Sequence, residues 1–244
     1  RLPKFQNKNL RIALNLAFDF EWTNKNLFFS AYDRTDSFFS NSLFSAPEHL
    51  TNNEKNLIKN LKLTNINESK LNNYQNPKTN GNGNGNNRAH LLEAAKLLKE
   101  AGFYLKDMIL YDPTTNNPVT LEFLIVSPSF QRVILPYMQN LKKLGIKTQI
   151  KLVDFSIYQK RLENFDFEIT IHVFGGTMIP GTEQYSYWHS SNIWQNGSSN
   201  LAGISNPNID KIVMEISKVK SLEELQSLTY LLDRLLLENN YVIP

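Results

Sequence analysis

Cysteine is absent from this 244-residue sequence, which excludes disulfide frameworks, cysteine-ligated zinc or iron–sulfur centres and thiol catalysis. No run of 18 or more apolar residues occurs, so the sequence contains no candidate membrane-spanning helix. Charge of one sign is scarce as well: the formal net charge is +3, and Lys and Arg never gather in a cluster of five or six. Because acidic residues are also interspersed throughout, we expect no binding to nucleic acid.

Recognised catalytic and cofactor motifs are missing too. There is no Gly-x-Ser-x-Gly nucleophile elbow. Asp19 and Glu21 are interpreted as surface or capping charges rather than an acid–base pair. The pattern Gly81-x-Gly83-x-Gly85 has no strand in front of it, so it predicts a solvated loop rather than a phosphate-binding loop. We therefore predict no enzyme activity, no cofactor and no metal, since no metal-binding motif includes the histidines, which are His49, His90, His172 and His189.

What the sequence does contain is enough apolar material for a core. Hydrophobic residues make up 41% of the chain, and it has 15 Phe, 10 Tyr and 3 Trp, which excludes a wholly disordered protein. The excess of Asn between residues 52 and 87 is interpreted as the coding bias of an AT-rich genome. The first residue is not Met and the last four resemble the start of a strand, so we expect part of a longer chain.

The N-terminal part predicts one amphipathic helix and then an aromatic stretch. Apolar residues recur at helical spacing from Leu10 to Phe20, and aromatic residues follow between Trp22 and Phe44. Within this stretch Arg34 lies among charged and aromatic neighbours. It forms either a local ion-pair loop or a contact with a ligand carboxylate, which suits its planar guanidinium.

From residue 88 onward, helical and strand patterns alternate. Asn86 or Asn87 is expected to cap the first helix, and Gly102 to end it. Three strands are predicted, with helices between them, at 119–126, 147–153 and 167–174. Two successive strand–helix–strand units imply parallel pairing through right-handed crossovers, so the fold class is α/β.

Local start signals define the remaining helices. Asp154 is expected to cap the helix before the third strand. Pro207 lies near the first turn of a later helix, and Ser221 with Glu224 forms a capping box for the last one.

The stretch 167–188 is the most informative about function. Its predicted strand contains His172 and ends in Phe174, two glycines and Thr177, with Tyr187 close behind. Ligands gather at the carboxyl ends of parallel strands, glycines let another backbone approach closely, and aromatic side chains offer apolar walls. The pattern predicts a binding rim without catalytic residues, and a plain irregular connection is the alternative.

Ordered motifs along nearly the whole chain carry a resemblance to a known family. They include Ala13-Leu14-Asn15-Leu16-Ala17-Phe18-Asp19-Phe20-Glu21-Trp22, Tyr32-x-Arg34-Thr35, Leu97-Leu98-Lys99-Glu100-Ala101-Gly102-Phe103, Ser127-Pro128-Ser129-Phe130, Pro180-Gly181-Thr182-Glu183-Gln184 and Asn200-x-Ala202-Gly203-Ile204. With these motifs the sequence resembles the family-5 extracellular solute-binding proteins of ABC transporters, and within them the YejA-type oligopeptide-binding branch. The match weakens only over 43–87.

The resemblance implies a periplasmic-binding-protein-like (type II) lobe, with a mostly parallel sheet flanked by helices. Residues 1–244 would be the second lobe, with an irregular polar insertion at about 43–87, and the first lobe would be absent from this chain. The whole protein would be an exported, periplasmic monomer that binds an oligopeptide between two lobes and delivers it to ABC transporter permease subunits. The implied ligand-binding residues are Arg34, Phe38, His172, Phe174, Gly175, Gly176, Thr177, Glu183, Tyr187, Trp188 and Asn200.

One position departs from the family pattern. Many peptide binders of the wider family carry an aspartate three residues after the aromatic at the end of this strand, where it holds the peptide's α-amino group. Here the aromatic is Phe174 and the third residue on is Thr177, so Glu183 is the candidate replacement charge. Other ligands for the same fold, namely a nickel complex, haem or a sugar, stay open as alternatives, as does an α/β enzyme.

Overall fold

The computed structural model describes residues 1–72, 74–79 and 87–244, which form two compact units. The first unit comprises residues 1–34 and 77–172 together with Ile243, and the second comprises residues 35–76 and 173–242 together with Pro244. The glycine pattern at Gly81, Gly83 and Gly85 lies outside the described residues. Among the described helices, none has the length and apolar character needed to cross a bilayer.

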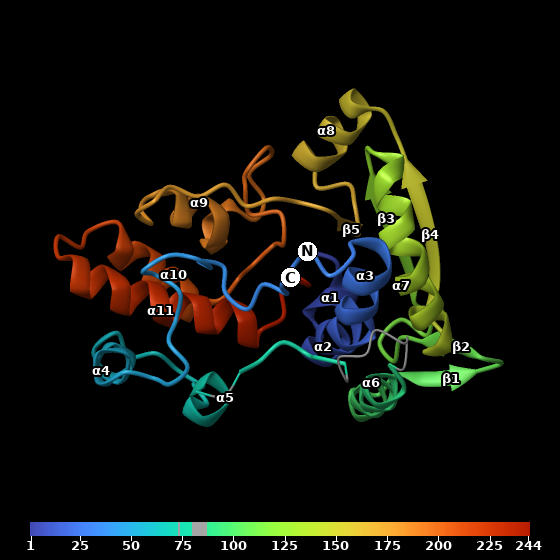
Figure 1. The fold of residues 1–244 in the computed structure, drawn as a ribbon, viewed down its shortest axis with the longest axis horizontal. Helices are drawn as coiled ribbons and strands as arrows, with labels where there is room; N and C mark the ends of the chain where they lie inside the picture. The colour runs from blue at the N-terminus through green and yellow to red at the C-terminus, as the bar shows by residue number, and fades with distance from the viewer. Residues whose placement is uncertain (73, 80–86) are drawn as a thin grey trace. The chain divides into compact units, whose positions relative to one another are not determined.

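A three-stranded parallel sheet organises the first unit (Figure 1). Its strands are β3 (Thr120–Ile125), β4 (Lys147–Leu152) and β5 (Ile169–Thr170), in the order β4-β3-β5. The crossover helices are α7 (Gln131–Lys143), which follows a 3-10 turn η1 (Pro128–Phe130), and α8 (Phe155–Glu163). The two predicted strand–helix–strand units are therefore confirmed, and the Asp154 side chain caps α8 by accepting from the Ile157 amide at 2.9 Å.

The third strand is shorter than predicted. Leu124 of β3 pairs with Thr170, and β3 ends one residue later, so the chain beyond Thr170 has no strand to continue against. The carbonyl of Ile171 instead accepts a hydrogen bond from the Tyr158 hydroxyl at 3.0 Å. The prediction of a strand through Phe174 was therefore wrong, because strand length depends on register, which the hydrophobic pattern does not show.

Helices pack with this sheet around the core of the first unit. They are α1 (Pro3–Gln6), α2 (Lys8–Ala17), α3 (Phe20–Leu27) and α6 (Arg88–Glu100). The single predicted N-terminal helix is divided between α2 and α3, because Phe18 is extended and Asp19 caps a new helix by accepting from the Trp22 amide. The fully buried side chains of this core include Leu10, Leu98, Leu121, Leu141 and Ile146.

Two further details of the first unit differ from expectation. Asn87 precedes α6 without capping it, because its side-chain amide donates to the carbonyls of Leu16 and Ala17 in α2. An unpredicted antiparallel hairpin, β1 (Tyr104–Lys106) and β2 (Ile109–Tyr111), follows this helix. Its strands have three residues each, too few for an alternating pattern to stand out.

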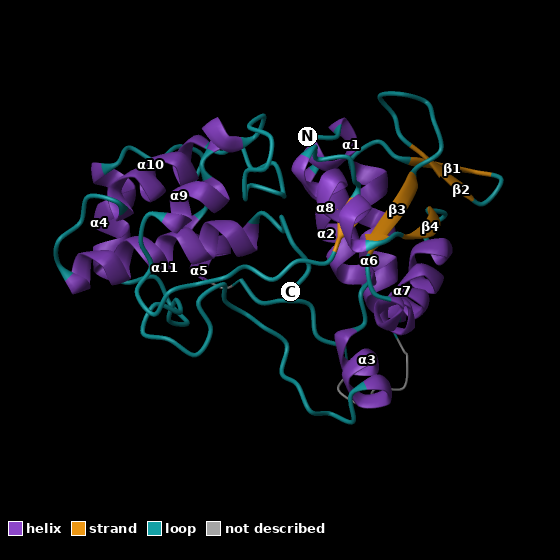
Figure 2. Cartoon of the chain, turned by 90° about the horizontal axis from the view of Figure 1, so that it is seen from above, coloured by secondary structure: helices purple, strands orange, loops and turns teal. Residues whose placement is uncertain are grey.

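Helices and loops make up the described part of the second unit, and all described strands lie in the first (Figure 2). The helices are α4 (Asn52–Asn60), α5 (Glu68–Asn72), α9 (Glu183–Trp188), α10 (Pro207–Ile216) and α11 (Leu222–Glu238), with a 3-10 turn η2 (Ser190–Asn192). Pro207 begins α10, as predicted. The Ser221 side chain caps α11 by accepting from the Glu224 amide, which is one of the two bonds of the predicted capping box. Both helices bury apolar residues such as Ile209, Ile212, Leu228 and Leu232 in one core.

The described part of the segment 43–87 contains two helices, α4 and α5, where an irregular polar insertion was expected. Thr51 and Glu54 form a complete capping box for α4: the Glu54 amide donates to the Thr51 hydroxyl at 3.2 Å, and the Thr51 amide donates to Glu54 Oε2 at 2.8 Å. Ile58 of α4 and Leu71 of α5 are buried in the core of the second unit. These apolar positions were concealed by the Asn-rich composition around them.

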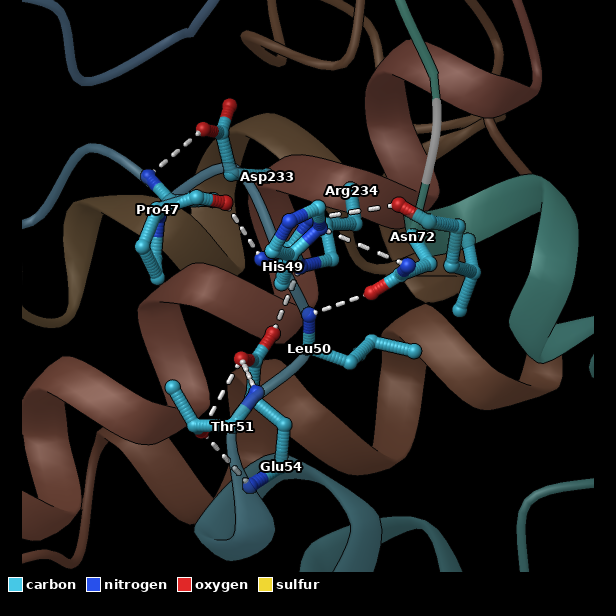
Figure 3. Close-up of polar contacts among 10 residues, drawn as sticks. Pro47, His49, Leu50, Thr51, Glu54, Asn72, Asp233 and Arg234 are labelled. Atoms are coloured by element: carbon cyan, nitrogen blue, oxygen red, sulfur yellow. Dashed lines mark hydrogen bonds and ion pairs between the residues drawn. The ribbon is translucent and has the colours of Figure 1, made fainter.

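A buried ion pair joins α4 to α11 (Figure 3). Arg234 Nε lies 2.7 Å from Glu54 Oε1, and the Glu54 side chain is fully buried. The same guanidinium donates to the carbonyls of Leu71 at 3.1 Å and Pro47 at 2.6 Å. One side chain of α11 therefore fixes α4, the end of α5 and the loop that precedes α4.

Candidate functional site

The second unit contains a pocket of about 190 Å³. Aromatic residues, glycines and uncharged polar residues line it, and none of the lining side chains carries a formal charge. The lining residues are Phe38, Phe39, Ser40, Ser42, Phe44, Phe174, Gly175, Gly176, Thr177, Met178, Pro180, Gln184, Tyr187 and Trp188. Of the sequence-predicted site residues, seven therefore lie together, namely Phe38, Phe174, Gly175, Gly176, Thr177, Tyr187 and Trp188.

Four aromatic rings form the pocket wall. Trp188 lies against Phe38 at 5.3 Å between ring centroids and against Phe174 at 4.8 Å, and Phe174 meets Tyr187 edge-on at 5.6 Å. Such tilted and edge-to-face arrangements are the favourable ones for aromatic pairs. The Trp188 indole N–H donates to Gln184 Oε1 at 2.8 Å, one helical turn earlier, so its polar atom is satisfied away from solvent. The wall is thus held together by contacts among its own side chains.

The two glycines form the exposed part of the rim. Tyr187 donates its hydroxyl to the Gly175 carbonyl at 2.9 Å, which ties the rim to α9. A Cβ built on Gly176 would meet no described atom within 4 Å. Neither glycine has a positive φ. The backbone conformation therefore does not require them, and the space they leave beside the aromatic wall permits a close approach by an extended chain.

Glu183 lies beside the pocket but outside its lining. Its Oε1 accepts from the Gly181 amide at 2.9 Å, the Gln184 amide group at 3.1 Å and the Thr177 hydroxyl at 3.3 Å. Burial raises the pKa of this carboxyl, but these hydrogen bonds outweigh it and hold the pKa below its ordinary value. Glu183 is therefore a carboxylate at neutral pH, and it closes the loop between Thr177 and α9.

Two predicted site residues, Arg34 and His172, belong to the first unit. Arg34 donates to Asn15 Oδ1 at 2.6 Å and to the Pro77 carbonyl at 2.5 Å, and its guanidinium lies 5.8 Å from the Phe18 ring. Both of these acceptors are neutral oxygens. His172 follows β5 and is exposed, and desolvation by nearby atoms lowers its pKa, which favours the neutral imidazole.

Asn200 has a different role from the one expected. The residue is fully buried, and its amide nitrogen donates to the carbonyls of His189 at 3.1 Å and Ile204 at 3.0 Å. Its oxygen accepts from the Ile204 amide at 2.8 Å. Asn200 therefore holds the loop before α10, and it is not among the residues that line the pocket.

Several lining residues escaped the sequence reasoning. They are Phe39, Ser40, Ser42, Phe44, Met178, Pro180 and Gln184. The aromatic run from Phe38 to Phe44 was visible, but the sequence does not show that it folds against α9. For Gln184 the signal was its spacing of four residues from Trp188 on one helix. Among the described residues, no group of three or more His, Asp or Glu is arranged to hold a metal ion.

Solved structures share this fold. The oligopeptide-binding protein AppA of Bacillus subtilis, solved with a nonapeptide, matches 97% of this chain with a TM-score of 0.69 and 18% identity, and 41% of AppA is covered. The periplasmic oligopeptide-binding protein of Thermotoga maritima, solved with mannohexaose, matches the whole chain with a TM-score of 0.69 and 17% identity, and 41% of that protein is covered. Together with the parallel sheet, these likenesses confirm the α/β, periplasmic-binding-protein-like fold class.

Sequence comparison gives closer relatives. A probable peptide-binding protein YejA of Agrobacterium fabrum is 40% identical over the whole of this chain, which spans 39% of that protein's length. The YejA protein of Escherichia coli is 34% identical over 243 residues, and 40% of its length is covered. The model of the bacterial extracellular solute-binding proteins, family 5, middle region, matches residues 2–196. The predicted resemblance is therefore confirmed: this chain belongs to the family-5 bacterial extracellular solute-binding proteins and is of the YejA type.

Proposed function

We propose that the whole protein is the substrate-binding component of an ABC importer, that it binds oligopeptides, and that the pocket of the second unit receives one side chain of the peptide. The pocket carries this proposal, because its walls are aromatic and its lining has no charged group. Its volume of about 190 Å³ is well below the roughly 300–1,000 Å³ of sites that enclose a whole drug-sized ligand. It therefore suits a single apolar side chain.

The peptide backbone has a matching place beside the pocket. Residues 175–177 are exposed and Gly176 faces open space, so an extended chain can pair its main-chain groups there. Main-chain pairing supplies affinity without strict sequence selectivity, and the pocket adds a preference at one position. No bond is made or broken in this mechanism, so the protein binds and releases its ligand rather than transforming it.

The wider setting belongs to the same proposal. The chain would be one lobe of a two-lobed, exported, monomeric protein that works in the periplasm and delivers its ligand to permease subunits. The relatives support this, since the chain spans only about two fifths of their length and they include a probable peptide-binding protein. The first lobe would then lie outside residues 1–244.

The test compares two tetrapeptides, Ala-Phe-Ala-Ala and Ala-Glu-Ala-Ala, by calorimetry with the full-length protein. Burying a Phe side chain contributes about 1.5–3 kcal/mol, so the first peptide should bind at least about tenfold more tightly. Phe174→Ala should remove this preference by opening the aromatic wall. Phe29→Ala is the matched control, since Phe29 is 89% exposed and outside the pocket. Equal binding of both peptides by the unmodified protein would refute the assignment of the pocket.

A different solute is the second candidate. The Thermotoga maritima structure contains mannohexaose, so this fold also accepts an oligosaccharide, and aromatic walls without charge suit sugar rings as well. Nickel complexes and haem stay open in the same way. Native mass spectrometry of the full-length protein, purified without exogenous ligand, distinguishes these cargoes by the mass of the molecule retained.

A further inference from the structure

One turn supplies a large share of the pocket lining. Residues 37–46 contain no helix or strand, yet they contribute Phe38, Phe39, Ser40, Ser42 and Phe44 to the pocket. Short hydrogen bonds give this turn its local shape. The Ser42 hydroxyl donates to the Phe39 carbonyl at 2.7 Å, for example, and the Phe39 amide donates to the Ser37 hydroxyl at 2.9 Å. Such local bonds fix the conformation of the turn but not its place against the rest of the pocket.

The place of the turn is set from α11. The Asp233 carboxylate accepts from the Phe38 amide at 2.8 Å with Oδ1 and from the Ala46 amide at 3.3 Å with Oδ2, and Ser37 bonds to it through its hydroxyl. One side chain thus holds both ends of the turn. Figure 3 shows Asp233 beside the segment that leads into Pro47. Asp233 is only 1% exposed, so water does not compete for these contacts.

The middle of the turn is also tied to α11. The Leu43 carbonyl accepts from the Tyr230 hydroxyl at 2.9 Å and from the Gln226 amide group at 3.3 Å. Gln226, Tyr230 and Asp233 are spaced four and three residues apart, which places them on one face of the helix. This face is a platform on which the turn rests, and Asp233 is its buried member.

We infer that Asp233 is a positioning residue for ligand binding: by holding both ends of the turn 37–46, it keeps Phe38 and Phe44 in the pocket wall before a ligand arrives. The inference rests on the proposed function, because the pocket must be where the peptide side chain binds. Asp233 itself does not line the pocket. Its effect passes through Phe38, whose ring packs against Trp188 at 5.3 Å and Phe174 at 6.0 Å.

The test uses Asp233→Ala in the full-length protein, with amide hydrogen exchange and peptide binding measured side by side. Alanine suits a helix interior but leaves the Phe38 and Ala46 amides without their acceptor. Exchange over residues 37–46 should rise at least about tenfold, and affinity for Ala-Phe-Ala-Ala should fall by about tenfold. Exchange in α10 should stay unchanged, because a positioning role is local.

Two further variants make the test specific. Asp233→Asn keeps one oxygen for the Phe38 amide, so it should restore part of the protection and part of the affinity. Glu224→Ala removes an exposed acidic residue of the same helix and should change neither quantity. If Asp233→Ala does not fold, the comparison of Asp233→Asn with the unmodified protein replaces it: exchange over 37–46 should rise and affinity should fall, each by less than expected for alanine.

The outcomes separate the two proposals. Faster exchange over 37–46 together with weaker binding of Ala-Phe-Ala-Ala supports the inference. Unchanged exchange in Asp233→Ala overturns it directly, whatever the peptide does. Faster exchange with unchanged affinity overturns it through its premise, since the turn would then be held by Asp233 but the pocket would not be the peptide site.

Discussion

The buried ion pair between Glu54 and Arg234 gives a sharp prediction about stability. The side chains are 0% and 6% exposed, so neither charge can turn to solvent if its partner is lost. Glu54→Gln should destabilise the second unit by about 3–5 kcal/mol, because it leaves the Arg234 guanidinium buried without a counter-charge. A glutamine oxygen can still accept either from Arg234 or from the Thr51 amide, but it cannot serve both as the carboxylate does.

Arg234→Met should cost more than Glu54→Gln. It leaves the Glu54 carboxylate buried without a counter-charge, and it leaves the carbonyls of Leu71 and Pro47 without their hydrogen-bond donor. The double variant Glu54→Met with Arg234→Met removes both charges and should be more stable than Arg234→Met alone, because burying an unpaired charge costs more than the pair contributes. The exposed pair Lys218–Glu215 is the matched control, and Glu215→Gln should change stability by less than about 1 kcal/mol.

The assay is urea unfolding followed by tryptophan fluorescence. Of the tryptophans in residues 1–244, Trp188 and Trp194 lie in the second unit and Trp22 lies in the first, so a Trp22→Phe background removes the first unit's contribution to the signal. Circular dichroism at 222 nm verifies that each variant is folded before denaturant is added. A cost below about 1 kcal/mol for Glu54→Gln, or a double variant less stable than Arg234→Met, would refute the reasoning.

Two other predictions concern single carboxylates. If the Glu183 carboxylate holds the amino group of the peptide, Glu183→Gln should weaken binding of peptides with a free amino terminus by about tenfold and leave acetylated peptides unaffected. Unchanged affinity of the variant for both kinds of peptide would contradict this role of Glu183. Burial raises the pKa of Asp233 from 3.8 to about 6. Between these pH values the folded protein keeps a proton on Asp233 that the unfolded chain has released, so the folded state loses stability as pH rises from about 4 to about 6. The Arg234 charge lowers this pKa in part, and Arg234 stays in place in Asp233→Asn. Urea unfolding at pH 4.5 and 7 should therefore show a fall in stability of about 2 kcal/mol in the unmodified protein relative to this variant, and parallel pH profiles would exclude the effect.

Sequence reasoning succeeded where the controlling signals are local. The caps at Asp154 and Ser221 and the proline at Pro207 each act within one helical turn, and each marks a helix start in the structure. Parallel pairing of β3 with β4 also followed from the order of strands and helices. The end of β5 did not, because it depends on how far the neighbouring strand extends.

In the candidate site, too, the residues that are close in sequence were predictable and the contacts between distant segments were not. Phe174, the two glycines and Tyr187 are close in sequence, so their grouping was predictable from the motif alone. The turn around Phe38 is held at the pocket by the bond from the Phe38 amide to Asp233, which lies 195 positions away. No pattern within either segment predicts that contact. Asn200 was assigned to the site because it belongs to a motif, whereas its hydrogen bonds are those of a buried structural residue.

Two adjacent residues of α11, Asp233 and Arg234, hold different parts of the second unit in place. Arg234 binds the loop and helices that complete the core, while Asp233 binds the turn that completes the pocket. Neighbouring residues on a helix point about 100° apart, so a single helix presents one to each structure. Both side chains are buried and satisfied by hydrogen bonds, and an apolar substitution at either position would leave backbone groups without partners. The aromatic wall is therefore supported by polar contacts behind it, and the residues that shape the pocket extend beyond those that line it.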